Sequence, residues 1–210
     1  MQNHNWFLSS FSLDRFLKFA LFFPPKRALS KFLCDGDTVV EIGCGKGHLT
    51  IPIAEIIGPG GRVYATDSDE KSIAMLRTKA RKKGYEKIIE SKATSPEDLT
   101  FIPDSSVDFV FAIGLLCSIS NRPGAIHEIK RILKKCEGQA YLSVSNALKN
   151  RKGQPAVSKE EWRQLLGDFD VLDRGGSILS RWAVVSTLRD HPQDRFLINN
   201  TNQSPMGQFT

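Results

Sequence analysis

Apolar and polar positions follow two different periods along the chain, and the two periods take turns from residue 37 onward. Short runs of apolar and β-branched residues between turn residues indicate strands, while apolar residues three and four positions apart indicate helices. The predicted strands span residues 38–42, 62–66, 87–90, 107–113, 139–144, 168–172 and 180–188. The predicted helices span residues 48–57, 69–83 and 122–135, and a last one opens at Ser158 with a capping-box pattern to Glu161.

This alternation of strands and helices predicts an α/β fold. Strand–helix–strand units place parallel strands side by side, with the connecting helices on the faces of the sheet. The run from Val107 to Ile113 is apolar apart from Asp108, which is typical of a strand buried on both faces. We therefore expect a doubly wound, mostly parallel sheet of seven strands, preceded by an N-terminal helical leader.

The leader, residues 1–35, has a helical pattern rich in aromatic side chains. Seven of the thirteen phenylalanines lie in the first 32 residues, and Pro24 and Pro25 end a first helix and can open a second. This apolar face must pack on something, either as a lid over a substrate site or as part of the core. We expect the sheet domain over residues 36–190 and a flexible polar tail over residues 191–210.

The composition is that of one ordinary globular domain of 210 residues. Hydrophobic residues make up 40% of the chain and charged residues 25%, and the four cysteines form no CxxC pair. Neither a metal site nor a disulfide framework is indicated. No stretch reaches the roughly 20 uncharged apolar residues of a transmembrane helix. These features predict a cytoplasmic protein without a transmembrane segment.

The net charge of +6 permits an anionic partner without requiring one. Lys and Arg gather between Lys71 and Lys92, on a predicted helix and just beyond its C-terminal end, where cations complement the helix dipole. A solvated helix face is the simplest interpretation of this cluster. Contact with nucleic acid or with an acidic membrane surface stays open as the alternative.

The segment most informative about chemistry joins the first strand to the first helix, with the pattern E-x-G-x-G-x-G over residues 41–47. Glycines at such a junction let a ligand approach the backbone at the carboxyl edge of the sheet. A dinucleotide fingerprint would need its third glycine at position 48, where His48 stands, so a nucleotide-dependent oxidoreductase is disfavoured. The acid Glu41 precedes the first glycine by two residues instead.

A second acid, Asp67, ends the second predicted strand, twenty residues after Gly47. A carboxylate in this place can accept hydrogen bonds from both ribose hydroxyls of an adenosyl group. The alternative is that it caps the next helix, but Asp69 is the better placed cap. This arrangement leaves Asp67 free for a ribose.

Together these segments resemble motif I and the following elements of the class I S-adenosylmethionine-dependent methyltransferases. The run L-T-I-P-I-A at residues 49–54 is similar to the helix of the UbiE-like, type 11 branch. The resemblance covers about residues 37–144. It implies S-adenosylmethionine as cofactor and S-adenosylhomocysteine as product, with no metal.

The resemblance also implies roles for single residues. The loop of Gly43, Gly45 and Gly47 would wrap the methionine part of the cofactor, and Glu41 would anchor its amino group. The acid that commonly contacts adenine in the family is absent here, so Thr94 or Ser95 would have to take its place. The complete set of expected cofactor-binding residues is Glu41, Gly43, Cys44, Gly45, Gly47, His48, Asp67, Ser68, Thr94 and Ile113.

The reaction expected from the resemblance is methyl transfer to an acceptor that the sequence does not name. Cys117 occupies the place where many relatives carry a histidine, and we interpret it as a small pocket wall, so no catalytic residue is assigned. The aromatic leader favours an apolar or amphipathic small molecule. A protein or RNA acceptor, or a non-catalytic methyltransferase-like protein that binds the cofactor or a partner, are the alternatives.

Overall fold

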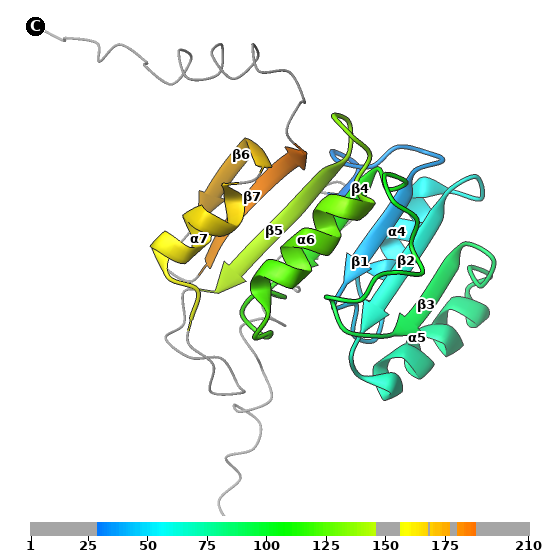
Figure 1. Cartoon of the computed structure of the whole chain (residues 1–210). Helices are drawn as coiled ribbons and strands as arrows, with labels where there is room; N and C mark the ends of the chain where they lie inside the picture. Colours follow the sequence, from blue (N-terminus) through cyan, green and yellow to red (C-terminus); the bar gives the residue numbers. More distant parts are fainter. Residues whose placement is uncertain (1–28, 146–155, 168, 177–179, 188–210) are drawn as a thin grey trace, which may run out of the picture.

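The computed structural model describes residues 29–145, 156–167, 169–176 and 180–187, which form one seven-stranded sheet covered by helices (Figure 1). The strands are β1 (Thr38–Ile42), β2 (Arg62–Asp67), β3 (Ile89–Ala93), β4 (Phe109–Ile113), β5 (Gln139–Ser145), β6 (Phe169–Gly176) and β7 (Ser180–Thr187). The helices are α4 (Thr50–Ile57), α5 (Glu70–Lys82), α6 (Arg122–Ile132) and α7 (Lys159–Leu166).

The strand order is β3-β2-β1-β4-β5-β7-β6, and the first five strands of this order are parallel. β1 pairs with β2 on one side, with Val39 opposite Val63, and with β4 on the other, with Val39 opposite Phe109. The predicted doubly wound, mostly parallel sheet of seven strands is confirmed. The order reverses between β1 and β4, and in open α/β sheets a ligand crevice forms at the carboxyl ends of strands at such a point.

The last two strands are antiparallel, with β7 inserted between β5 and β6. The sequence pattern predicted both strands but not their direction. Only residues 177–179 separate β6 from β7, and a connection this short can join antiparallel strands but not parallel ones. β6 also extends to Gly176, beyond the predicted end at residue 172.

The predicted third strand at residues 87–90 is displaced, because β3 begins only at Ile89. A turn after α5 takes up the first residues of the predicted strand. The carbonyl oxygen of Tyr85 accepts hydrogen bonds from the N–H groups of Ile88 and Ile89, at 3.0 and 2.9 Å. The positive φ of Gly84 (+76°) lets the chain leave the helix in this direction.

Side-chain caps fix the starts of two helices, as the sequence indicates. The Asp69 carboxylate accepts hydrogen bonds from the N–H groups of Lys71 and Ser72, both at 3.2 Å, and the Ser158 hydroxyl accepts one from Glu161 N–H at 3.0 Å. Two predicted helices are shorter than expected. α4 begins at Thr50 instead of residue 48. α6 ends at Ile132 instead of residue 135, because Leu133 is extended and forms a parallel β-bridge with Val107, two residues before β4.

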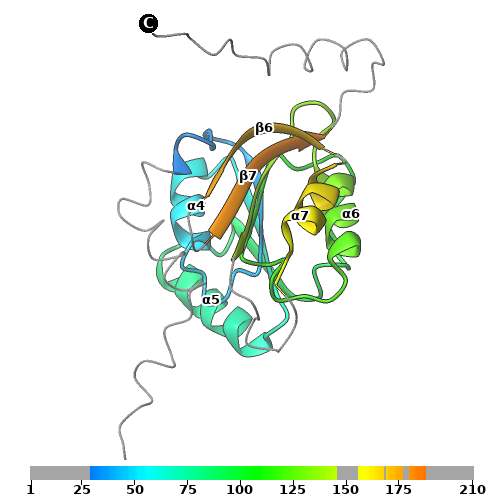
Figure 2. The same ribbon diagram turned by 90° about the vertical axis from the view of Figure 1, so that its left-hand side faces the viewer.

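Helices cover the sheet on both faces, α4 and α5 on one and α6 and α7 on the other (Figure 2). The last residues of the leader belong to the core on the α4 face, because Leu29 and Leu33 are only 3% and 5% exposed and Phe32 packs on Phe109 at a ring distance of 5.4 Å. The rest of the leader and the tail at residues 191–210 lie outside the described residues. None of the described helices is long and apolar enough to cross a membrane.

Candidate functional site

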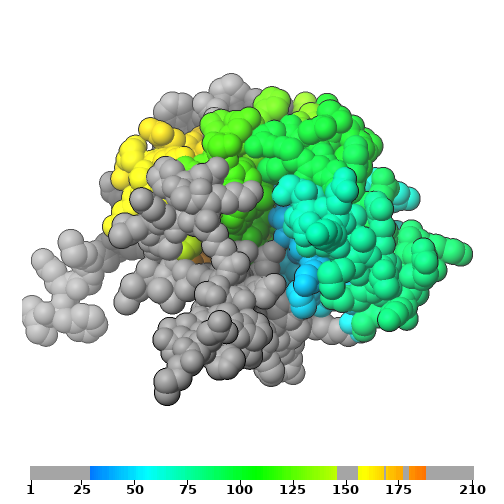
Figure 3. Space-filling view, turned by 90° about the horizontal axis from the view of Figure 1, so that it is seen from below, coloured from blue at the N-terminus to red at the C-terminus, as the bar shows by residue number. Residues whose placement is uncertain are grey.

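A cavity of about 290 Å³ opens at the carboxyl ends of β1 and β4, where the strand order reverses. Its walls come from the glycine loop after β1, the end of β2, the segment after β3 and the loop after β4. Viewed from below, blue residues are visible between the cyan and green parts of the domain (Figure 3). Nine of the ten residues predicted from the sequence line this cavity: Glu41, Gly43, Cys44, Gly45, His48, Asp67, Ser68, Thr94 and Ile113.

The glycine loop is held by the end of β2. The N–H groups of Gly43 and Cys44 both donate to the carbonyl oxygen of Thr66, at 2.7 and 2.9 Å, and Gly45 N–H donates to the Asp67 carboxylate at 2.8 Å. Gly43 and Gly45 have φ values of +80° and +52°, which side chains with a Cβ rarely adopt. These three N–H groups are therefore engaged within the protein, and the loop contributes open space, since no heavy atom lies within 4 Å of a Cβ placed at Gly45.

Gly47 is the one predicted residue that the structure places outside the cavity lining. Its absent side chain serves helix packing. A Cβ built at Gly47 would lie 2.3 Å from Cδ1 of Leu76, a buried residue of α5. The third glycine of the motif therefore allows α5 to approach the loop, in addition to having a positive φ of +72°.

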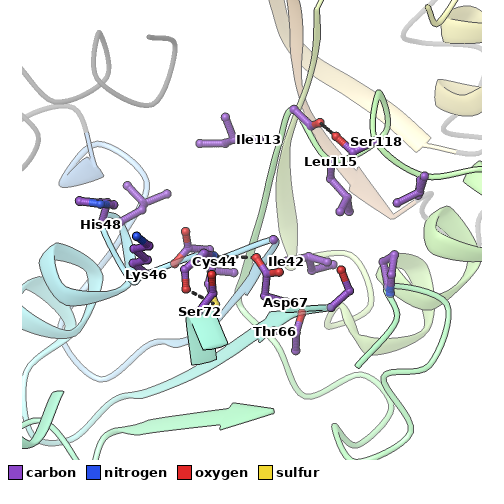
Figure 4. Close-up of a pocket in the computed structure, with 18 of the residues that line it drawn as sticks. Ile42, Cys44, Lys46, His48, Thr66, Asp67, Ser72, Ile113, Leu115 and Ser118 are labelled. Atoms are coloured by element: carbon purple, nitrogen blue, oxygen red, sulfur yellow. Dashed lines mark hydrogen bonds between the residues drawn. The ribbon is translucent and has the colours of Figure 1, made fainter. Parts of the chain in front are cut away.

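Asp67 is not free, contrary to the expectation from the sequence. One of its carboxylate oxygens accepts from Gly45 N–H and the other accepts from Asp69 N–H at 3.0 Å. A carboxylate offers about four lone-pair sites, so each oxygen can accept one more hydrogen bond. Asp69 caps α5 as predicted, which leaves the half-buried Asp67 carboxylate facing the cavity beside Ser72 (Figure 4).

Glu41 is nearly inaccessible, with 3% of its surface exposed, and its Oε2 accepts a hydrogen bond from the Thr50 hydroxyl at 2.5 Å. This bond connects the end of β1 to the start of α4, on either side of the glycine loop. Thr66 adds a second buried polar group to the cavity wall. Its Oγ1 atom has no hydrogen-bond partner in the part of the chain that the structure describes.

The segment after β3 supplies Thr94 and Pro96. Thr94 N–H donates to the carbonyl oxygen of Asp67 at 3.0 Å, and its hydroxyl donates to the carbonyl oxygen of Asp98 at 3.0 Å. The Thr94 hydroxyl oxygen keeps its acceptor capacity toward the cavity. Among the described residues, no carboxylate from this segment lines the cavity, as the sequence indicated.

The loop after β4 contributes residues that the sequence reasoning did not assign to the cofactor site. Leu115 and Ser118 lie on the other side of the cavity from Asp67, in the loop that follows Ile113 (Figure 4), and Ile119 also lines the cavity. The sequence feature that could have identified them is the run of apolar residues directly after a buried strand. An apolar wall facing a carboxylate suits a ligand with one flat apolar part and several hydroxyl or amino groups.

Cys117 does not line the cavity, although the sequence suggested a pocket wall. The residue is buried, and its sulfur accepts a hydrogen bond from Ser145 N–H at 2.9 Å. This contact ties the loop after β4 to the end of β5. Cys117 therefore lies one layer behind the cavity wall.

The rim of the cavity carries positive charge. Lys46 lines the opening, and the Lys79 ammonium group of α5 donates to the Lys46 carbonyl oxygen at 2.8 Å. Burial, together with the positive charges of Lys46 and Lys83, lowers the pKa of Lys79. In the described ranges, no group of three or more His, Cys, Asp or Glu side chains is placed to hold a metal ion.

Comparisons with known proteins agree with this geometry. Residues 40–141 match the family model of the methyltransferase domain. A ubiquinone/menaquinone biosynthesis C-methyltransferase UbiE from Hydrogenovibrio crunogenus is 31% identical over 167 residues, which cover 77% of this chain and 62% of the relative. A probable cobalt-precorrin-6B C(15)-methyltransferase (decarboxylating) from Pyrobaculum calidifontis is 37% identical over 90 residues, which cover 42% of this chain and 46% of the relative.

The chain thus spans about half to three fifths of the length of these two relatives. A solved S-adenosylmethionine-dependent methyltransferase from Aquifex aeolicus has the same fold, with a TM-score of 0.65 at 22% identity over 83% of this chain and 97% of that one. The motif, the cavity at the point where the strand order reverses and these similarities lead to one assignment. The chain carries a class I S-adenosylmethionine-dependent methyltransferase domain of the UbiE-like type.

Proposed function

We propose that the protein transfers the methyl group of S-adenosylmethionine to a small apolar or amphipathic acceptor and releases S-adenosylhomocysteine. The observation that carries this proposal is the convergence of nine sequence-predicted residues on one cavity at the carboxyl edge of the sheet. These residues come from four separate segments of the chain. A plain strand-to-helix turn would not require that convergence.

The residues present suit the cofactor. The two oxygens of Asp67 retain lone pairs for the ribose hydroxyls, and the buried Glu41 carboxylate carries a charge opposite to that of the amino group. The unpartnered Thr66 hydroxyl in the cavity wall is the kind of group that a polar ligand satisfies. Ile113 offers the apolar surface that an adenine ring needs.

The methyl sulfonium of the bound cofactor supplies the electrophile, so the task of the chain is to position groups. Gly43 and Gly45 keep side chains out of the space beside β1, and Asp67 holds the loop in that shape through Gly45 N–H. Correct orientation of two reactants is worth about 7–11 kcal/mol of the barrier in well-aligned cases. No general base is required for this contribution.

The acceptor class is inferred from the cavity wall and from the relatives. Leu115 and Ile119 give the loop after β4 an apolar surface, and Ser118 adds one hydroxyl. The relatives are named for quinone biosynthesis and for cobalt-precorrin methylation, both of which concern small molecules. A small acceptor with an apolar body agrees with both observations.

Isothermal titration of the full chain with S-adenosylhomocysteine, with NAD as the control ligand, tests the cofactor site. We expect binding of S-adenosylhomocysteine and none of NAD. Incubation with labelled S-adenosylmethionine and a small-molecule extract then tests transfer, with Gly45→Val as the inactive control. Binding without transfer to small molecules, protein or RNA would favour the non-catalytic alternative, and label in protein or RNA would redirect the acceptor class. Absence of S-adenosylhomocysteine binding at millimolar concentration would contradict the proposal.

A further inference from the structure

Arg181 lies at the same edge of the sheet as the cofactor cavity. β7 begins beside the carboxyl end of β5, where Ser145 pairs with Ser180 and Val144 with Arg181. β5 in turn pairs with β4, whose end leads into the cavity wall. Adjacent strands are about 4.8 Å apart, so the Arg181 backbone is roughly 10 Å from the end of β4.

The Arg181 side chain points to the face covered by α6 and α7. Side chains alternate between the two faces of a strand, and Ala183 and Val185 of β7 belong to the core cluster that includes Ile126 of α6 and Trp162 of α7. Arg181 precedes Ala183 by two residues, so its side chain points to the same face of the sheet as those of Ala183 and Val185. Its Nη2 atom donates to the carbonyl oxygen of Val157, just before α7.

The other nitrogen atoms of the Arg181 guanidinium are buried without a partner. Within the described residues, neither Nε nor Nη1 has a hydrogen-bond acceptor. Its neighbours in the sheet cannot supply one from a side chain, because Arg181 stands between Val144 and Gly176. Three N–H groups of a charged side chain therefore remain unsatisfied.

Among the described residues, two other partly or fully buried arginines on this face contrast with Arg181. Arg122 donates to the Leu116 carbonyl oxygen and to the Glu161 carboxylate, and Arg131 donates to the Glu128 carboxylate. A buried charge without a partner is costly to a folded protein, and a bound anion that supplies the missing contacts is one explanation for such a group. Of these three arginines, Arg181 is the one whose buried Nε and Nη1 atoms have no hydrogen-bond partner.

Arginine matches oxyanions in charge and in donor geometry. We propose that Arg181 binds an oxyanion, a carboxylate or a phosphate group, of the methyl acceptor. The inference rests on the proposed function and narrows its acceptor to an amphipathic molecule with an anionic group at one end.

The strand neighbours of Arg181 lie close to the loop that forms the cavity wall. Ser145, at the end of β5 beside Arg181, donates to Cys117, and Cys117 belongs to the loop whose Leu115 and Ile119 form the apolar cavity wall. An acceptor anchored by its anionic end at Arg181 would extend over about 10 Å toward that wall, by the strand spacing given above. Its apolar body would then face Leu115 and Ile119.

The test uses the full chain and simple anions as probes. The melting temperature is measured during titration with sodium phosphate and, separately, with sodium acetate, with chloride holding the ionic strength constant. Each titration is done with and without S-adenosylhomocysteine, on the wild type, Arg181→Met, Arg181→Lys and the matched control Arg174→Met. Arg174 is an exposed arginine on the neighbouring strand β6.

We expect one of the two oxyanions to raise the melting temperature of the wild type and of Arg174→Met, and the responding anion identifies the acceptor group as carboxylate or phosphate. In Arg181→Met the apparent affinity for that anion should fall about 10- to 100-fold, as for loss of a hydrogen-bonded charge. Arg181→Lys should retain a weaker response. Without oxyanion, Arg181→Met should change the melting temperature little, because it removes two unpaired nitrogen atoms, Nε and Nη1, together with the single hydrogen bond from Nη2 to the Val157 carbonyl oxygen.

An unchanged anion response in Arg181→Met, or no response in the wild type, would overturn the inference. If S-adenosylhomocysteine does not bind the wild type, this result contradicts the proposed function instead. The anion titrations without that ligand still test Arg181 independently.

Discussion

The carboxylate of Asp67 accepts a hydrogen bond from the backbone N–H of Gly45 at 2.8 Å, and this bond joins the end of β2 to the glycine loop after β1. Two motifs that are 22 residues apart in the chain therefore act as one unit. The acid shapes the loop in addition to facing the cavity. Its replacement should affect both the fold and ligand binding.

Asp67→Asn should weaken S-adenosylhomocysteine binding by about 1.5–3 kcal/mol and lower the free energy of unfolding by about 1 kcal/mol. Gly45 N–H and Asp69 N–H bond to different oxygens of Asp67, and in asparagine one of these oxygens becomes an NH2 group that would face an N–H donor. Calorimetric titration and urea denaturation measure the two effects. Asp173→Asn, at an exposed carboxylate of β6 that accepts from its neighbour Arg174 N–H, should change neither. Wild-type binding by Asp67→Asn would exclude Asp67 from the ribose site.

The glycines at positions 45 and 47 should respond differently to alanine. Gly47→Ala should lower the free energy of unfolding by about 2–4 kcal/mol, because the new methyl group meets Leu76 and the φ of +72° is unfavourable. Gly45→Ala has open space and should cost only the backbone term of about 1–2 kcal/mol. In S-adenosylhomocysteine affinity the order should reverse, since only Gly45 lines the cavity. Equal losses of affinity in the two variants would contradict these separate roles.

Glu128 should make the stability of the fold depend on pH. The side-chain hydrogen bond from Arg131, with a further bond from Leu99 N–H, lowers the pKa of this carboxyl group in the folded state. The stabilisation is then present above the unfolded pKa of about 4.3 and is lost as the pH falls through the lower folded value. Glu128→Gln should be less stable than the wild type by about 1–3 kcal/mol at pH 7.

The difference between Glu128→Gln and the wild type should shrink below about pH 4, because the wild-type carboxyl group is then also uncharged. Urea denaturation between pH 3 and pH 7 measures this difference in the free energy of unfolding. Glu160→Gln is the matched control, since Glu160 pairs with Arg163 on the exposed surface of α7 and should contribute less than about 1 kcal/mol. A constant difference over the whole pH range would argue against an ionised Glu128 as the source.

Deletions in the leader should separate the lid interpretation from the core interpretation. Removing residues 1–23 should leave a folded protein that binds S-adenosylhomocysteine but has little turnover, if this segment acts on the acceptor side. Removing residues 1–35 should destabilise the fold strongly, because the burial of Leu29 and Leu33 contributes about 1.5–3 kcal/mol each. Circular dichroism and cofactor titration of both deletions decide between the interpretations. Aggregation of the shorter deletion would return residues 1–23 to the core.

The glycine motif and Asp67 were predictable because local sequence determines them. A loop that needs positive φ requires glycine, and an acid at a strand end is recognisable from the strand pattern. The partners of these residues were not predictable. That Thr66 and Asp67 accept the N–H groups of the glycine loop follows from the parallel pairing of β1 with β2, which brings together residues more than twenty positions apart.

The antiparallel direction of β7 and its position between β5 and β6 could not be predicted from the sequence for a related reason. Apolar alternation identifies a strand but not its neighbours, and the preference for a hairpin between β6 and β7 depends on a short connection rather than on any motif. The unpaired hydrogen-bond donors of Arg181 could not be predicted from the sequence either. On sequence alone, an arginine in a strand is a solvated edge residue, and only the pairing with Val144 and Gly176 shows that the guanidinium has no acceptor beside it.

The inner place of β7 also determines when the domain can be completed during biosynthesis. The ribosome makes the parallel strands first, but the outer edge of β5 stays unpaired until residues 180–187 have emerged. An open strand edge on a partly folded domain readily pairs with other chains. The nascent protein therefore exposes the edge of β5 until late in its translation, and a ribosome that stalls before Ser180 leaves a product that has most of the domain and an unpaired β5 edge.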